Sequence, residues 1–284
     1  MTTGTVLITG CSSGFGKLTV RTFLDEGWNV VATMRSPEKQ SDLVSNERLL
    51  VNRLDVTQSE TIQSTINAAT DRFGTIDAVV NNAGYGGYGL FEQSSEADIR
   101  AMFETNVFGP MAVMRAVLPA MREAGRGVIV NVTSMAGHMA LPGNAIYSSS
   151  KHAIVGLTEA MALEYRPLGI RIFSVAPGAY PTTRFTENTD KRVEEGDAEL
   201  AAFSHRLRAQ IDAVGEQMAN QSGTTADPQE VADKIYRCVT TEMPVHNPTG
   251  ADAEMLIAMM GQADRQTFLD QISDMLVPQH QQVQ

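Results

Sequence analysis

The feature that most constrains this chain is the regular return of short β-branched runs, separated by stretches of helical length. The runs cover residues 5–8, 29–32, 49–53, 76–80, 128–132 and 170–175. Each run is too short for a helix and is apolar enough to be buried on both faces, which is typical of parallel strands. The alternation predicts an α/β fold with a doubly wound, mostly parallel sheet, Rossmann-like, in a three-layer α/β/α sandwich.

The gaps between these runs are long enough for helices. They cover residues 14–26, 59–73, 97–122 and 145–165. Pro110 and Pro119 fall within the third gap. We expect these prolines to bend or interrupt a helix there, because proline lacks the backbone N–H that a helix interior needs.

Beyond Pro177 the alternation weakens. Residues 182–223 are polar and predicted to be partly helical, and we expect them to form a mobile lid over a substrate. Pro228 begins a predicted helix that runs towards Thr241, and a C-terminal helical segment is expected over about residues 252–276. Three methionines in that segment have helical spacing, which favours core or subunit packing over a cofactor contact. They are Met255, Met259 and Met260.

Length and charge narrow the class of protein. No linker or repeat divides the first 180 residues, so we expect one Rossmann-like domain over residues 1–284. The net charge of −11 disfavours nucleic acid and anionic membranes as partners. There is no apolar stretch of about 20 residues that could span a bilayer. Only two cysteines occur, without metal-site or disulfide spacing, and together these observations predict a cytoplasmic protein.

A glycine-rich turn follows the first predicted strand. Residues 9–16 have the sequence T-G-C-S-S-G-F-G, in which Gly10, Gly14 and Gly16 precede good helix formers. Glycines let the backbone approach a pyrophosphate, and the N–H groups that begin the helix attract its charge. Tight turns of this kind also occur without a ligand, but the strand before it and the helix after it favour a dinucleotide site.

A second motif combines Ser134, Tyr147 and Lys151. Tyrosine and lysine four apart share one face of a helix, so a phenol and an ammonium can meet there. A free tyrosine titrates near ~10, and its use at neutral pH needs a shift of roughly three units, or about 4 kcal/mol. Lys151 on the same helical face favours the phenolate. Tyr147 is therefore predicted to be the general acid and base, with Ser134 bonded to the same substrate oxygen.

In their order and spacing, these motifs resemble the short-chain dehydrogenase/reductase family over roughly residues 5–182. The glycine turn with its cysteine, and residues 32–35, look like the branch that includes 17β-hydroxysteroid and retinol dehydrogenases. A lone Y-x-x-x-K is weak evidence, whereas a series of motifs in the family's order and spacing is strong evidence. The matching residues are Thr9 to Gly16, Asp55 with Val56, Asn81 to Gly84, Asn106, Ser134, Tyr147 with Lys151, and Pro177 with Gly178 and Thr182.

The resemblance implies a role at the cofactor for many of these residues. Asp55 would hold the adenine ring, although an aspartate before Thr57 also suits a turn or a helix cap. Asn81 would have a structural role, and Thr182 would bond the nicotinamide carboxamide. The full set implied to contact the cofactor is Gly10, Ser12, Ser13, Gly14, Phe15, Gly16, Arg35, Asp55, Val56, Asn82, Ala83, Gly84, Tyr147, Lys151, Pro177, Gly178 and Thr182.

The resemblance also implies a proton path. Lys151 would bind the nicotinamide ribose, and Asn106 would hold a water that links Lys151 to solvent. Asn106 could equally satisfy backbone groups near Pro110. His138 and His152 are not predicted to be catalytic, because neither has an evident partner or position on the Tyr147 face.

The end of the second strand indicates which nicotinamide cofactor is preferred. Met34 stands where NAD-preferring relatives carry aspartate, and Arg35 follows it. A guanidinium favours a 2′-phosphate, and Ser12, Ser36 and Lys17 could add donors or charge. NADP(H) is therefore the predicted cofactor, and NAD(H) is the alternative. The competing interpretation of Arg35 is an ordinary solvated side chain at a strand end.

The substrate is predicted to be a medium-sized or lipophilic ketone, aldehyde or alcohol. Its walls are expected from residues 85–90, 138–144 and 182–223. The resemblance implies a homodimer or homotetramer, because relatives pair through the helices that here contain Asn106 and Tyr147. A small-residue face on the tyrosine helix agrees with this, although such residues also suit close packing of a helix on a sheet. That face comprises Ser148, Ser149, Ala153 and Gly156. The alternative function is a non-catalytic redox sensor that binds the nucleotide without hydride transfer; epimerisation of a sugar nucleotide is a weaker rival.

Overall fold

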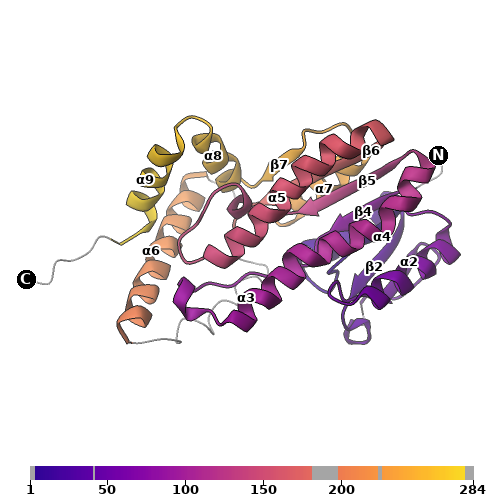
Figure 1. Cartoon of the computed structure of the whole chain (residues 1–284), viewed down its shortest axis with the longest axis horizontal. Helices are drawn as coiled ribbons and strands as arrows, with labels where there is room; N and C mark the ends of the chain where they lie inside the picture. The colour runs from indigo at the N-terminus through magenta and orange to yellow at the C-terminus, as the bar shows by residue number, and fades with distance from the viewer. Residues whose placement is uncertain (1–3, 41, 181–197, 223–225, 279–284) are drawn as a thin grey trace, which may run out of the picture.

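The structure is a computed structural model that describes residues 4–40, 42–180, 198–222 and 226–278. A seven-stranded sheet forms its centre, in the order β3-β2-β1-β4-β5-β6-β7, with every neighbouring pair parallel (Figure 1). The strands are β1 (Thr5–Ile8), β2 (Asn29–Met34), β3 (Leu49–Arg53), β4 (Ala78–Asn81), β5 (Gly127–Val132), β6 (Ile170–Pro177) and β7 (His246–Thr249). The predicted doubly wound α/β fold is confirmed.

Helices cover both faces of the sheet because alternate strand residues point to opposite sides. Val6 and Ile8 of β1 belong to a core with Phe23 of α1 (Gly14–Asp25) and Ile235 of α7 (Gln229–Thr240). Leu7, between them, belongs to the core on the other face. That second core is completed by α2 (Ser59–Phe73), α4 (Gly109–Ala124) and α5 (Ala145–Tyr165).

The long helix expected over residues 97–122 is interrupted once. It divides into α3 (Glu96–Phe103), a π-helical turn η3 (Glu104–Phe108) and α4. Pro110 lies in the first turn of α4, where a missing N–H is tolerated, whereas Pro119 lies inside α4 without ending it. The interruption thus lies just ahead of Pro110, and Pro119 does not interrupt the helix.

Short 3-10 turns connect several elements. They are η1 (Pro37–Lys39), η2 (Phe91–Gln93), η4 (Met135–Gly137) and η5 (Arg166–Leu168). The η4 turn follows β5 directly and leads towards α5. It therefore lies at the carboxyl end of the sheet, where parallel α/β sheets bind their ligands.

Three helices gather beyond the carboxyl ends of the strands (Figure 1). They are α6 (Ala198–Ser222), α8 (Ala251–Met260) and α9 (Arg265–Leu276). Met139, Phe268 and Ile272 form the buried centre of this group, and Met259 and Met260 pack against it, whereas Met255 is 45% exposed. Two of the three methionines thus pack in an apolar cluster, as predicted.

Strand β7 was not predicted. Its sequence, H-N-P-T, lacks the β-branched pattern of the other strands, and its strand geometry comes from pairing with β6, in which Pro177 lies beside Thr249. Cys11 and Cys238 are both buried and free. Over the described ranges, no helix is long and apolar enough to cross a membrane.

Candidate active site

Tyr147 and Lys151 lie in the first two turns of α5, and both side chains are buried. The Nζ atom of Lys151 is 5.7 Å from the centre of the Tyr147 ring. The same nitrogen donates a hydrogen bond to the carbonyl oxygen of Val132, at a distance of 2.9 Å. The helix thus brings the phenol and the amine together, and the last residue of β5 fixes the amine.

Ser134 lies beside Tyr147 but comes from a different segment of the chain. It follows β5 and caps η4, and its Oγ accepts a hydrogen bond of 3.1 Å from the Ala136 N–H. A hydrogen bond also joins the side chains of Ser134 and Tyr147. The three residues of the second sequence motif therefore converge at the carboxyl end of β5.

The protonation of these groups follows from their burial. Burial raises the pKa of Tyr147 to about 12, against a smaller lowering by the hydrogen bond with Ser134. Burial lowers the pKa of Lys151 to about 8. The sequence predicted a lowered tyrosine pKa, whereas in the protein alone desolvation of the phenolate outweighs the stabilising contacts. The phenol is consequently protonated at neutral pH.

Asn106 lies in the π-helical turn and connects two segments of the site. Its Nδ2 donates to the Tyr85 carbonyl at 2.8 Å and to the Ser150 Oγ at 3.1 Å, and its Oδ1 accepts from the Tyr85 N–H at 3.1 Å. A Cβ on Gly84 would lie 3.1 Å from Asn106 Oδ1 and 3.6 Å from Lys151 Nζ. Asn106 therefore satisfies backbone groups, as the alternative interpretation held, and also lies beside the same glycine as Lys151.

The glycine-rich turn has the shape that a pyrophosphate requires. Gly10 and Gly14 have positive φ angles of 72° and 53°, which side chains of other residues disfavour. A Cβ on Gly16 would lie 2.4 Å from the Gly10 carbonyl oxygen, so the turn closes only with glycine there. The hydroxyl of Ser13, at the N-cap of α1, makes no capping bond, which leaves the first N–H groups of the helix for an anion. These features fit a dinucleotide, and Ser12, Ser13 and Phe15 are partly exposed at the turn.

The residues after β4 form hydrogen bonds with the glycine-rich turn. Asn82 donates through Nδ2 to the carbonyls of Thr9 and Gly10, at 2.9 and 3.0 Å. The Thr9 hydroxyl accepts from the backbone N–H groups of Asn82 and Ala83, both at 3.0 Å. Asn81 donates to Asn131 at 2.9 Å, in the structural position that the family resemblance implies. The ends of β1 and β4 are thus held together.

Asp55 and Val56 follow β3. The carboxylate of Asp55 accepts from the N–H and the hydroxyl of Thr57, at 3.0 and 2.8 Å. This is the turn-forming role that the sequence left open beside adenine binding. Val56 is buried and packs against Gly109, where a Cβ would approach it to 2.6 Å.

At the end of β2, Met34 is buried and Arg35 is exposed. No described residue forms a salt bridge with Arg35. Lys17 pairs instead with Asp42, and this contact holds the pKa of the Asp42 carboxyl below its usual value. Lys17 was expected to add charge at the cofactor if the helix turned it inward. Its ammonium instead forms an ion pair with the carboxylate of Asp42.

Pro177 ends β6, and the Gly178 N–H donates to the Thr249 carbonyl at 2.9 Å. Tyr180 is buried with its ring edge-on to Phe15, at a centroid distance of 5.2 Å. It connects the turn after β6 to the glycine-rich turn. Thr182 lies outside the described residues, and of the expected lid the described part is α6.

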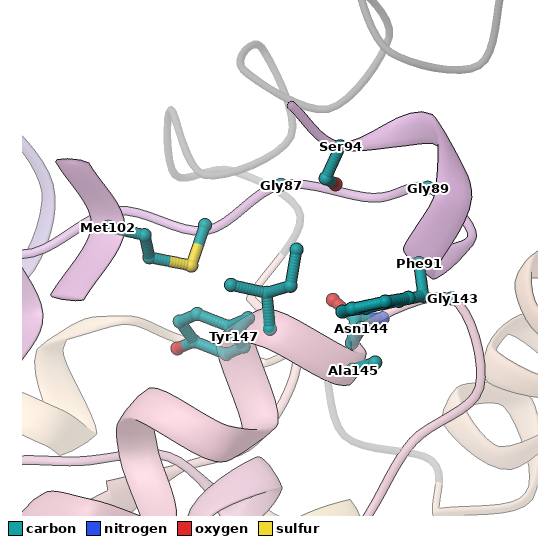
Figure 2. Close-up of a pocket in the computed structure, with 10 residues that line it drawn as sticks. Gly87, Gly89, Phe91, Ser94, Met102, Gly143, Asn144, Ala145 and Tyr147 are labelled. Atoms are coloured by element: carbon teal, nitrogen blue, oxygen red, sulfur yellow. The ribbon is translucent and has the colours of Figure 1, made fainter. Parts of the chain in front are cut away.

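A small pocket opens beside Tyr147. Figure 2 shows Met102 and Tyr147 at one end of it and Phe91 and Asn144 at the other. Two of the expected substrate walls, residues 85–90 and 138–144, both contribute to its lining. The complete lining is Gly87, Gly89, Phe91, Ser94, Met102, Gly143, Asn144, Ala145, Ile146 and Tyr147.

The sequence analysis missed the residues that surround His138. The ring of His138 lies edge-on to His246, with 5.0 Å between the centroids, and His246 contacts Ser174 and Glu159, each at 2.8 Å. Burial lowers the pKa of His138 to about 4, so this histidine is neutral near pH 7. His246 is over 100 residues away in sequence, so spacing gave no signal of it. In the described part of the chain, no group of three or more His, Cys, Asp or Glu side chains could hold a metal ion.

The fold and this site define a dinucleotide-binding α/β protein of the Rossmann type. Comparison with known proteins identifies the family within this class. A family model described as short chain dehydrogenase matches residues 4–193. A short-chain dehydrogenase from Streptomyces avermitilis, of known structure, is 32% identical with a TM-score of 0.81, over 95% of this chain and 96% of that one. The chain therefore belongs to the short-chain dehydrogenase/reductase family and is an oxidoreductase of that family.

Two further relatives bear on cofactor and substrate. A short chain dehydrogenase from Burkholderia cenocepacia, solved in complex with NADP, is 26% identical with a TM-score of 0.74, over 97% of this chain and 98% of that one. The 3-ketodihydrosphingosine reductase of Bacteroides thetaiotaomicron is 40% identical over 183 residues, which cover 64% of this chain and 66% of that protein. Related proteins thus include one solved with NADP and one named as a 3-ketodihydrosphingosine reductase.

Proposed function

We propose that this protein transfers a hydride between NADP(H) and a carbonyl compound or secondary alcohol, with Tyr147 as general acid and base. The observation that carries the proposal is the convergence of Ser134, Tyr147 and Lys151 at the end of β5, beside a glycine turn shaped for a pyrophosphate. A redox sensor would need only the second feature. The retained proton-transfer group therefore favours an enzyme.

The cofactor would lie across the carboxyl ends of the strands. Gly10, Gly14 and Gly16 would admit the pyrophosphate, with Asp55 and Val56 near the adenine end. Asn82 to Gly84 and the Pro177–Gly178 turn would flank the nicotinamide end, where Thr182 would bond the carboxamide. When bound, the reduced nicotinamide supplies the hydride.

Tyr147 would donate its proton to the substrate oxygen during reduction. Its raised pKa keeps the phenol protonated at neutral pH, which suits this direction. Ser134 would hydrogen-bond the same oxygen and stabilise the charge that develops on it. Lys151 would bind the ribose hydroxyls, and Asn106 would position a water between Lys151 and solvent.

Arg35 supports the preference for NADP(H). It is exposed, no described residue pairs with it, and it follows a buried methionine at the position where a carboxylate would repel a 2′-phosphate. The NADP complex of the Burkholderia relative agrees with this preference. NAD(H) remains the alternative cofactor.

The substrate we infer is a lipophilic ketone, aldehyde or alcohol. The pocket beside Tyr147 is lined by Phe91, Met102 and Ile146, and the apolar cluster of α8 and α9 includes Met135 and Met139 on the adjoining segment. The name of the Bacteroides relative points to the same chemical class. The substrate is therefore expected to carry an apolar chain or ring system next to its carbonyl group.

A single-domain enzyme in the cytoplasm, assembled as a homodimer or homotetramer, completes the proposal. Leu163 on α5 is 78% exposed and Phe108 in the adjoining π-helical turn is 51% exposed, which supports a subunit contact over these helices. Of the small residues expected there, Ser149 and Gly156 are exposed and Ser148 is buried. Sedimentation of the purified chain measures the assembly state directly.

The experiment that tests the function is oxidation of NADPH and NADH in parallel by purified protein, with a panel of short and long-chain ketones, aldehydes, steroids and retinoids. Turnover that prefers NADPH and an apolar ketone is the expected result. Tight nucleotide binding without turnover on any carbonyl or alcohol would favour the sensor. Failure to bind either nucleotide would contradict both functions.

A further inference from the structure

A carboxylate from the C-terminal part of the chain reaches the turn that follows β6. Asp252 lies in the first turn of α8, and its Oδ2 accepts a hydrogen bond from the Ala179 N–H at 2.7 Å. The donor belongs to the residue directly after Gly178. A hydrogen bond to an ionised acceptor is stronger than one between neutral groups, so this contact restrains the turn from outside β6.

Two glycines make room for this carboxylate. A Cβ on Gly178 would lie 1.9 Å from Asp252 Oδ1, and a Cβ on Gly250 would lie 2.9 Å from the same oxygen. Gly250 also has a positive φ of 97°, which directs the chain from β7 into α8. The carboxylate therefore occupies space that a side chain at either position would fill.

The restrained turn has further connections to the cofactor end of the molecule. Gly178 is bonded on its other side to Thr249, the last residue of β7. Tyr180 follows within two residues and packs its ring against Phe15 of the glycine-rich turn. A shift of this turn would therefore alter the site where the nicotinamide end of the cofactor is proposed to lie.

We propose that Asp252 is a positioning residue for the nicotinamide end of the cofactor, holding the Pro177–Ala179 turn in place from α8. The inference rests on the proposed function, since it takes the cofactor to lie on this turn. Asp252 need not touch the cofactor, because it acts through the Ala179 N–H. The C-terminal helices then contribute to cofactor binding as well as to the substrate side.

A merely structural role for Asp252 makes a different prediction. An acidic residue in the first turn stabilises a helix through its dipole, and such an effect would not distinguish one half of the cofactor from the other. Glu254 is a matched control, because it lies in the same turn, is exposed, and faces Lys234 at 4.0 Å instead of the cofactor turn.

The test measures the dissociation constants of NADPH and of adenosine 2′,5′-bisphosphate, the adenine half of NADP, with the full chain. Asp252→Ala should raise the constant for NADPH about 10-fold, as loss of about 1.4 kcal/mol of positioning would. Asp252→Asn, which keeps an acceptor without charge, should raise it about 3-fold. Both variants should bind the adenine half like the wild type, and Glu254→Gln should match the wild type for both ligands.

The outcomes separate this inference from the proposed function. Unchanged NADPH affinity in a folded Asp252 variant overturns the inference, and so does an equal loss for both ligands. If Asp252→Ala does not fold, Asp252→Asn decides by the same two measurements. A wild-type protein that binds NADPH and reduces a ketone keeps the proposed function whatever the variants do, whereas a wild type that binds no NADPH overturns both.

Discussion

The Nζ atom of Lys151 donates a hydrogen bond to the carbonyl oxygen of Val132, 2.9 Å away. Helix α5 and strand β5 are thereby joined at the point where the strand ends and Ser134 begins the next turn. A lysine has three donors, so this bond leaves two for a ribose and a water. The buried amine is consequently fixed in position before any cofactor binds.

The pH dependence of reduction should reveal this lysine. Burial lowers the pKa of Lys151 to about 8, so the ammonium is present below that pH and is lost above it. We expect kcat/KM for ketone reduction to be level between pH 6 and 7 and to fall above about pH 8. In Lys151→Arg the guanidinium keeps its charge, and the fall should disappear even if the rate is lower throughout. A wild-type profile that stays level to pH 10 would contradict the role of the ammonium.

Gly16→Ala should weaken NADPH binding by more than about 10-fold, because the new methyl group would meet the Gly10 carbonyl and distort the pyrophosphate turn. Gly215→Ala is the control, since its Cβ would meet nothing within 4 Å on α6. The control should bind NADPH normally and gain about 0.5–1 kcal/mol in the free energy of unfolding. Fluorescence titration and thermal unfolding measure the two quantities. Normal NADPH affinity in Gly16→Ala would count against the turn as the cofactor site.

Cofactor selectivity should move when the end of β2 is changed. Met34→Asp with Arg35→Ala supplies a carboxylate for a ribose diol and removes the guanidinium proposed to face the 2′-phosphate. We expect the NADPH/NADH ratio of kcat/KM to fall by at least about 10-fold. Arg48→Ala removes another exposed arginine, beside β3, as a control for the loss of a surface positive charge and should leave the ratio unchanged. A double variant with the wild-type ratio would refute the argument from Arg35.

The sequence predicted most of the framework because its signals are local. All six β-branched runs became strands, with bounds within two residues of those expected at either end. Pro110 marked the break between α3 and α4. The π-helical geometry of that break, which turns Asn106 towards Tyr85 and Ser150, had no sequence signal, because it depends on packing against α5.

What sequence reasoning missed depends on contacts between distant residues. Strand β7 exists through its pairing with β6, and Lys17 forms an ion pair with Asp42, a residue 25 positions away. The direction of the Tyr147 pKa depends on how deeply the ring is buried, which no spacing reveals. Asp252 was not singled out because its partner, the Ala179 N–H, is a backbone group 73 residues away.

The central claim is that Tyr147 delivers the proton that accompanies hydride transfer, and one comparison tests it most directly. The measurement is NADPH oxidation with the best ketone of the panel, for wild type, Tyr147→Phe and Tyr165→Phe, the last being a tyrosine at the far end of the same helix. Tyr147→Phe should lose about 100-fold or more in kcat and keep NADPH affinity within about 2-fold, because only the proton donor is removed. Tyr165→Phe should match the wild type. Turnover by Tyr147→Phe at the wild-type rate would contradict the account.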